Sequence, residues 1–305
     1  MLDIKDSVAS RLRMIQTEAL RRQPCTPHDL PAREVVIVLV DSLVAAMFPR
    51  HFGPAGLSEA NTDSFVSRTL DAALQALERQ IELELALAED WTMAECIDVT
   101  APLPRLASEI VADFAEALPR VREMLEIDIR AAFEGDPSAK SVDEVICCFP
   151  GIAALIRHRM AHELYRHGIT MLARIIAESA HSQTGIDIHP GAQIGRGFFI
   201  DHGTGVVIGE TAIIGQNCRL YQAVTLGAKR FEVDASGALL KNYPRHPILQ
   251  DNVVVYSGAT ILGRITIGHD SSIGGNVWLT QNVPPHSHIT QARARNDSYD
   301  EGAGI

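Results

Sequence analysis

A six-residue repeat of aliphatic side chains most constrains what the second part of this chain can form. Three runs keep the spacing: Ile188, Ile194 and Ile200; Ile208, Ile214, Leu220 and Leu226; and Leu249, Val255, Ile261, Ile267, Ile273 and Leu279. Six residues turn about 240° around an α-helix, so these side chains cannot share one helical face. A six-residue period indicates a parallel β-helix, in which three short strands close each triangular coil of about 18 residues.

The residues before this repeat follow the three- and four-residue apolar spacing of helices. Three examples are REVVIVLVDSLVAAMF, LDAALQALERQIELELALAE and ALIRHRMAHELYRHGITMLARIIAESAH. We therefore predict an α+β protein with an all-helical N-terminal domain over residues 1–184. A left-handed parallel β-helix is expected over residues 185–289, with an excursion loop over 227–247, and residues 290–305 are expected to form a C-terminal tail.

Charge and composition limit the classes of partner. The chain of 305 residues has a net charge of −11, which makes nucleic acid an unfavourable partner. Residues 186–305 hold 9 Lys and Arg against 10 Asp and Glu, which leaves 18 against 28 for the preceding residues. This nearly neutral second part can accept an anionic ligand. The sequence has no apolar run of about 18 residues, no secretory signal pattern and no CxxC pair, so we expect a cytoplasmic protein with reduced thiols and no membrane partner.

The repeat breaks at a histidine. Ile200 and Ile208 are eight residues apart, so two additional residues must bulge from the coil near His202. Irregularities of this kind re-aim side chains beside active sites. Asp187 precedes His202 by 15 residues, close to one coil, so we expect the carboxylate to stack next to the imidazole. An imidazole oriented in this way can act as a general base, and a surface turn is the alternative for an isolated pair.

A second interruption of the repeat, at residues 227–247, has about the length of one coil. Long excursions from a repeat scaffold commonly line a binding face. This one ends near Arg245 and His246, which bring a cation and a second imidazole. The excursion therefore favours a binding site over a simple turn at His202.

Longer stretches of the sequence carry a family resemblance. They read GDPSA at 135–139, DIHPGAQIGRGFFIDHGTGVVIGETAIIG at 187–215, and VTLG, RHP, GATILG and NVPPHS further on. With these motifs the chain resembles the serine acetyltransferases of the hexapeptide acyltransferase superfamily, closely from about residue 121 to 289. Hexapeptide repeats alone are less specific, because sugar and antibiotic acetyltransferases share them.

The resemblance implies roles for individual residues. His202 corresponds to the general base, and Asp187 to the aspartate that supports it. The resemblance further implies that L-serine is held by four residues: Asp136, Asp201, Arg245 and His246. This division suits a zwitterion, since carboxylates can bind the ammonium group and the Arg245 fork can bind the carboxylate. For Asp136, a turn with a helix cap is the alternative.

The implied reaction moves the acetyl group of acetyl-CoA to the hydroxyl of L-serine, which gives O-acetyl-L-serine and CoA in the first step of cysteine biosynthesis from serine. Acetyl-CoA is the co-substrate and no metal is implied. By analogy with the superfamily, CoA is expected along Gly227, Ser257 and Ala259, in a groove between neighbouring β-helices. The family's Gly-x-Pro-Ala-Arg is replaced by ITQARARNDSYDEGAGI, which leaves Arg293 and Arg295 as candidates for the CoA phosphates.

Two kinds of protein partner are also implied. The flat sides of a β-helix favour a homo-trimer or a dimer of trimers, with active sites between chains. The terminal Ile305 is similar to the end of the family's docking peptide, which enters the active site of O-acetylserine sulfhydrylase. A frayed tail is the alternative for this segment.

Three other functions fit the repeat. An acetyltransferase of the same fold could act on a sugar or antibiotic hydroxyl. A non-catalytic β-helix scaffold would lose no function beyond stability on replacement of His202 by alanine. A β-helical carbonic anhydrase would need three imidazoles around a zinc ion, whereas the repeat region supplies only His202 and His246 without a further pair in register.

Overall fold

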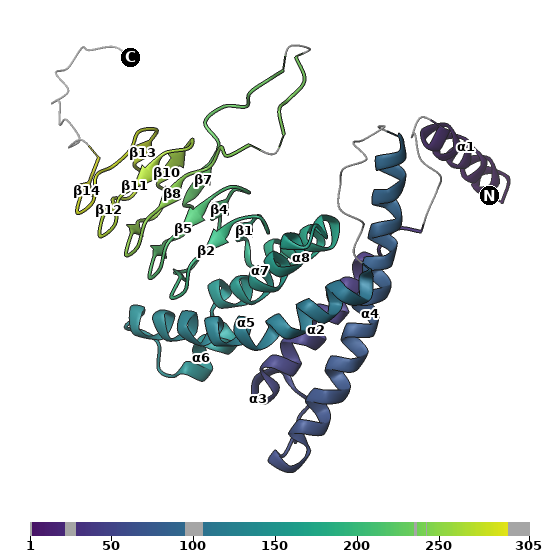
Figure 1. Ribbon diagram of the computed structural model, residues 1–305, viewed down its shortest axis with the longest axis horizontal. Helices are drawn as coiled ribbons and strands as arrows, with labels where there is room; N and C mark the ends of the chain where they lie inside the picture. Colours follow the sequence, from purple (N-terminus) through teal and green to yellow (C-terminus); the bar gives the residue numbers. More distant parts are fainter. Residues whose placement is uncertain (1, 22–28, 95–105, 235–236, 242, 292–305) are drawn as a thin grey trace. The chain divides into compact units, whose positions relative to one another are not determined.

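The computed structural model describes residues 2–21, 29–94, 106–234, 237–241 and 243–291 (Figure 1). Its helices are α1 (Leu2–Arg21), α2 (Arg33–Met47), α3 (Pro49–Phe52), α4 (Glu59–Ala94), α5 (Ala107–Gly135), α6 (Val142–Cys148), α7 (Pro150–Arg166) and α8 (Thr170–Thr184). The expected helical N-terminal region is confirmed. None of the described helices is long and apolar enough to span a membrane. Arg293, Arg295 and Ile305 lie outside the described residues.

Local sequence signals explain several helix ends. Ser141 caps α6, because its Oγ accepts a hydrogen bond from the backbone N–H of Glu144 at 3.1 Å. The first turn of α8 is capped from α4 by the buried Glu84, whose carboxylate accepts from the N–H groups of Met171 and Leu172 at 2.7 and 2.8 Å. Burial raises the pKa of the Glu84 carboxyl, and these backbone hydrogen bonds act in the opposite direction.

The strands form three parallel sheets, which we name A, B and C, and Figure 1 shows them stacked as successive coils. Sheet A contains β1 (Asp187–Ile188), β4 (Val207–Ile208), β7 (Thr225–Gly227), β10 (Thr260–Leu262) and β13 (Trp278–Leu279). Sheet B contains β2 (Gln193–Ile194), β5 (Ile213–Ile214), β8 (Ile248–Leu249) and β11 (Thr266–Ile267). Sheet C contains β3 (Phe199–Ile200), β6 (Arg219–Leu220), β9 (Val254–Val255), β12 (Ser272–Ile273) and β14 (His288–Ile289).

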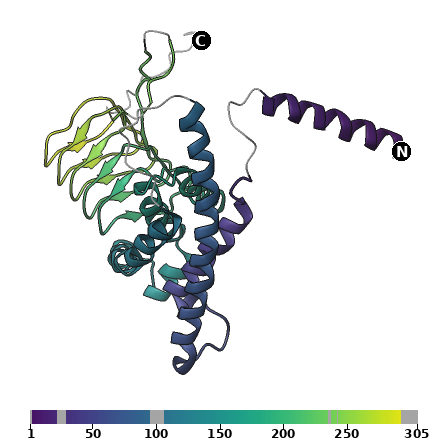
Figure 2. The ribbon, with the colours of Figure 1, turned by 45° about the vertical axis from the view of Figure 1, so that its right-hand side comes forward.

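The expected parallel β-helix is therefore confirmed, and Figure 2 shows its coils from a second direction. The chain visits sheets A, B and C in turn, so each coil contributes one strand to each sheet. The aliphatic residue of every hexapeptide from Ile188 to Ile273 is buried. These side chains fill the interior of the prism, and their burial supplies the main stabilisation of the coils.

The strand register gives the length of each coil. Ile208 pairs with Leu226, which is a step of 18 residues. Ile188 pairs with Ile208 over 20 residues, so this coil contains two additional residues. Leu226 pairs with Ile261 over 35 residues, so the excursion adds 17 residues to a regular coil. Both predicted interruptions of the repeat are thus present as insertions.

The chain divides into two compact units that do not follow the change from helix to strand. One unit contains residues 1–122 and 157–179, and the other contains 123–156 and 180–305. The second unit thus joins part of the helical sequence to the β-helix. Within it, the backbone N–H of Phe198 donates to the buried carboxylate of Asp128 at 3.0 Å. A Cβ on Gly151 would lie 2.3 Å from the carbonyl oxygen of Ile200, so the start of α7 packs directly against the first coil.

Candidate active site

The two additional residues of the first coil are His202 and Gly203. Where the chain passes from sheet C to sheet A, the N–H of Gly205 donates to the carbonyl of Gly185 at 2.8 Å, and the N–H of Ala223 donates to that of Thr204. These bonds keep the corner in register above and below the insertion. His202 and Gly203 have φ of 58° and 86°, so the chain bulges out of the regular coil there.

Backbone geometry exposes the His202 ring. The N–H of Gly203 donates to the carbonyl of Asp201 at 2.7 Å, which closes a tight turn around His202. A Cβ at position 203 would lie 2.4 Å from the side chain of Ile186, so only glycine fits. The His202 side chain is 70% exposed and can reach a substrate from this corner.

A cluster of opposite charges surrounds the imidazole. Asp201 Oδ1 lies 3.7 Å from His202 Nε2, and its Oδ2 accepts a hydrogen bond from Arg219 Nη2 at 2.7 Å. Asp136 follows α5, and its Oδ1 accepts from the N–H of Ser138 at 2.8 Å. The pKa of the Asp136 carboxyl is lowered, first by its hydrogen bonds with Ser138 and then by the charges of Arg219 and His202. The structure thus brings the predicted Asp136, Asp201 and His202 together.

Asp187 does not lie level with the imidazole. It pairs with Val207 across β1 and β4, because the coil has 20 residues, and His202 precedes that level. Among the described residues, the carboxylate that contacts His202 is that of Asp201. The supporting role of Asp187 stays a prediction.

Arg245 and His246 lie at another corner of the prism, where the chain passes from β7 of sheet A through the excursion to β8 of sheet B. Arg245 Nη2 forms an ion pair with Glu210 Oε2 at 2.5 Å. The His246 ring is buried, its Nδ1 accepts from the N–H of Thr211 at 3.1 Å, and a Cβ on Gly209 would lie 2.0 Å from the ring. Within one chain, this pair and His202 belong to different corners.

The residues predicted for CoA divide in the same way. Ser257 and Ala259 lie at the corner between sheets C and A, and Ala259 is fully buried. The carbonyl of Gly227 accepts from the N–H of Gly263 at 3.0 Å, beside a pocket of about 360 Å³. This pocket has four cationic side chains in its lining: Lys229, Arg230, Arg245 and Arg264.

Comparison with known proteins decides the family. No family model matches the chain. A curated protein of Synechococcus elongatus named "Serine acetyltransferase, plasmid" is 50% identical over 302 residues, which cover 98% of this chain and 94% of the relative. The chain belongs to the serine acetyltransferases. A structure of Entamoeba histolytica serine acetyltransferase 1 in complex with L-cysteine matches it with a TM-score of 0.71, at 35% identity over 87% of this chain and 88% of that one.

A second solved structure extends the likeness to a plant protein. Soybean serine acetyltransferase complexed with serine has a TM-score of 0.53 and 28% identity, over 87% of this chain and 99% of its own. The helical region followed by stacked parallel strands is thus the shared architecture of the serine acetyltransferases compared.

Arg219 is a residue of this serine acetyltransferase that sequence reasoning missed. Its guanidinium lies 4.7 Å from the ring centroids of both Phe199 and Tyr221, and Tyr221 stacks on Tyr256 at 5.1 Å. Held in this way, Arg219 orients the Asp201 carboxylate. Arg219 occupies an outward strand position of an ordinary hexapeptide, so the pattern carried no signal for it.

His246 predicts how the stability of this serine acetyltransferase changes with pH. Burial, followed by the charge of Arg245, lowers the pKa of His246 from 6.5 to about 4. Between these values the unfolded chain binds a proton that the folded chain does not, so the free energy of unfolding falls as pH falls from 6.5 to 4. Urea unfolding across this range should show a shallower fall for H246N than for the wild type, because asparagine does not titrate. Equal slopes would contradict a buried neutral imidazole.

Proposed function

We propose that this chain transfers the acetyl group of acetyl-CoA to the hydroxyl of L-serine, with His202 as the general base. The observation that carries the proposal is the two-residue insertion, which exposes an imidazole beside Asp201 and within the field of Asp136. The soybean relative was crystallised with serine, which supports serine as the acceptor.

The charges beside His202 suit an amino acid that carries an ammonium group. Asp136 and Asp201 offer carboxylates, and Arg219 fixes the second of them through Oδ2. The carboxylate of serine needs a cation, for which Arg245 presents a planar fork with two parallel donors. Because Arg245 lies at another corner of its own coil, we infer that the corner of a second copy supplies it. A homo-trimer, or a dimer of trimers, would bring the two corners together at each seam.

The positive pocket at the excursion supports the placement of acetyl-CoA. Its lysine and arginine side chains can bind the phosphates of the co-substrate, and Gly227 lies at its edge. No metal is required for acyl transfer from a thioester when a general base is present. We further propose, from the family resemblance, that Ile305 docks on O-acetylserine sulfhydrylase and that the protein works in the cytoplasm.

Acetyl transfer then proceeds in one active site. The unprotonated Nε2 of His202 accepts the proton of the serine hydroxyl as the oxygen attacks the thioester carbonyl carbon. Collapse of the tetrahedral intermediate breaks the carbon–sulfur bond, and the CoA sulfur receives the proton from His202. The products are O-acetyl-L-serine and CoA, and the imidazole returns to its starting form.

Acceptor analogues that lack one charge each give the direct test. CoA release from acetyl-CoA is measured with L-serine, with ethanolamine, which lacks the carboxylate, and with 3-hydroxypropanoate, which lacks the ammonium group. We expect kcat/KM for L-serine to exceed both by at least about 100-fold, because each analogue leaves a charged group of the site unpaired. Faster turnover with a sugar or antibiotic hydroxyl would favour the related acetyltransferases. Equal rates with ethanolamine would exclude a carboxylate site at Arg245.

A further inference from the structure

The corner that joins sheet B to sheet C carries a column of residues in the left-handed backbone region. In successive coils these residues have φ between 54° and 71°: Gly197, Asn217, Asn252, Asp270 and His286. Backbone hydrogen bonds hold the coils in register, as from the N–H of His286 to the carbonyl of His269 at 2.9 Å. Side chains at this corner therefore project from fixed backbone positions.

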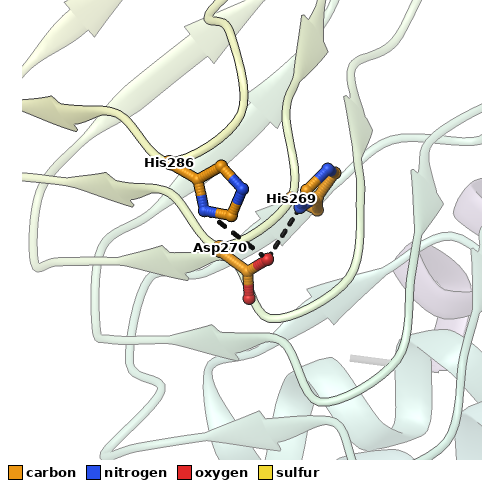
Figure 3. A group of neighbouring side chains, drawn as sticks. All are labelled: His269, Asp270 and His286. Atoms are coloured by element: carbon orange, nitrogen blue, oxygen red, sulfur yellow. Dashed lines mark hydrogen bonds and ion pairs between the residues drawn. The ribbon is translucent and has the colours of Figure 1, made fainter.

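Three side chains of the last two turns converge at this corner: His269, Asp270 and His286 (Figure 3). His269 Nδ1 lies 2.7 Å from Asp270 Oδ2, and His286 Nδ1 lies 3.8 Å from the same oxygen. One ligand atom from each residue lies within 4.8 Å of the other two. All three side chains are partly open to solvent, so an ion can reach them.

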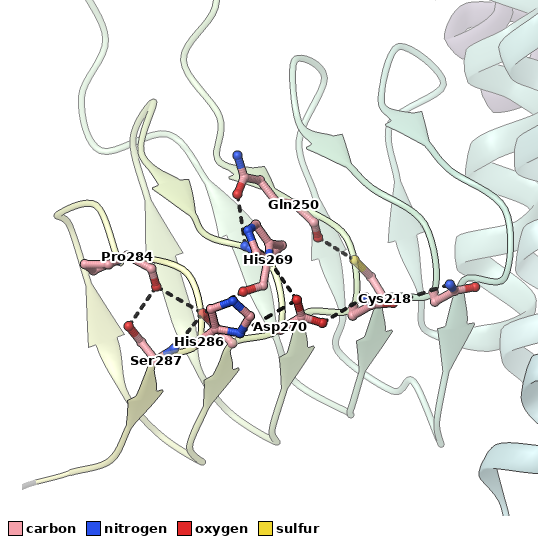
Figure 4. A network of polar contacts seen from close by, with 10 residues as sticks. Cys218, Gln250, His269, Asp270, Pro284, His286 and Ser287 are labelled. Atoms are coloured by element: carbon pink, nitrogen blue, oxygen red, sulfur yellow. Dashed lines mark hydrogen bonds and ion pairs between the residues drawn. The ribbon is translucent and has the colours of Figure 1, made fainter.

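A surrounding hydrogen-bond network orients the carboxylate (Figure 4). Asn252 Nδ2 donates to Asp270 Oδ1 at 2.9 Å, which leaves Oδ2 facing both imidazoles. Gln250 Oε1 accepts from the backbone N–H of His269 at 2.9 Å and so fixes the start of this turn. Hydrogen bonds from His269 and Asn252 lower the pKa of the Asp270 carboxyl, which keeps it an anion. Partners of this kind orient ligands in known metal sites.

We propose that His269, Asp270 and His286 bind one divalent transition-metal ion, with zinc as the best-suited ion. Zinc takes imidazole nitrogen and carboxylate oxygen at about 2.0–2.2 Å in a tetrahedron, which places neighbouring ligand atoms about 3.3–3.5 Å apart. The observed nitrogen–oxygen distances of 2.7 and 3.8 Å lie on either side of this value. Two imidazoles select against magnesium and calcium, which prefer oxygen ligands. Water completes the coordination.

This site goes beyond the proposed acetyl transfer and takes no part in it. His202 lies at the corner between sheets C and A in the first coil, whereas the metal site lies between sheets B and C, beside β12 and β14. Only the folded coils bring position 286 next to 269 and 270. Binding therefore stabilises the folded state, and the proton on a metal-binding imidazole nitrogen is released.

Zinc titration of the full chain, metal-free and without an affinity tag, tests the site by calorimetry and thermal unfolding. The variants are H286N and D270N, because asparagine accepts positive φ and can keep the hydrogen bond to Asn252. H288N is the matched control, since His288 lies two residues away and contacts Ser272. We expect one zinc ion per chain in the wild type and in H288N, and at least about tenfold weaker binding in both test variants. Zinc should raise the unfolding temperature only where binding is retained.

Two results would overturn the proposal. One is equal zinc affinity in the wild type and H286N, which would place any bound ion elsewhere, for example at the exposed Cys147 and Cys148. The other is a loss in H288N as large as that in H286N. Because CoA release is measured separately, failure of the metal site leaves the acetyl-transfer proposal standing, and the reverse also holds.

Discussion

Replacement of His202 by asparagine is expected to lower kcat for acetylation of L-serine by about 10²–10⁴-fold, the usual contribution of a general base. The amide cannot accept the proton of the hydroxyl, so the attacking oxygen stays protonated. Asparagine tolerates the φ of 58° at this position, and the insertion should therefore keep its backbone. Initial rates of CoA release at saturating L-serine and acetyl-CoA measure the effect.

The control for this experiment is H288N, which removes an imidazole from an outward position of β14 and should leave kcat unchanged. Both variants should show the wild-type circular dichroism and unfolding midpoint. If H202N kept more than a tenth of the wild-type kcat, His202 would not be the base. If the wild type also released no CoA with any acceptor, the non-catalytic scaffold would become the better explanation.

Mixed assemblies of two inactive variants should regain activity if each site lies between two chains. H202N damages the corner that carries Asp201, and R245A damages the corner at the end of the excursion. A seam with one intact corner from each variant is expected in about one quarter of cases when equal amounts assemble at random. We therefore expect ~25% of wild-type kcat per chain from the mixture, and almost none from either variant alone.

A matched mixture distinguishes this arrangement from a site within one chain. H202N mixed with D201N should stay inactive, because both substitutions damage the same corner and every seam then lacks it. Co-expression with two different tags and purification over both isolates the mixed assemblies. No recovery in the H202N and R245A mixture, with both variants present in one assembly, would show that Arg245 does not complete the site of a neighbouring chain.

Much of the fold follows from the period of the sequence. A hexapeptide places one side chain of each unit inside the prism, so Ile188, Ile261 and their equivalents can be assigned to the core without a structure. Departures from the period were equally readable. The eight-residue step around His202 appears as a two-residue insertion, and the excursion appears as 17 added residues.

Other features depended on contacts that no local pattern reports. The compact unit of the β-helix also includes residues 123–156, because Asp128 and Gly151 pack on the first coil. The contact of His202 with Asp201 could not be obtained from the 15-residue spacing to Asp187, since the coil has 20 residues. Sequence reasoning treated His286 as a structural turn residue, because His269 and Asp270 lie a full coil earlier.

The sequence by itself determined the coil, its interior residues, its two insertions and the exposed position of His202, since a strict period requires each side chain to point either in or out. Only the tertiary structure decided which outward residues meet. Arg219 reaches Asp201 from the coil above, and His286 reaches Asp270 from the coil below it in sequence order, because stacking joins residues about 18 positions apart. Outward positions carry no periodic constraint, and so their partners can be read only from the register of neighbouring coils.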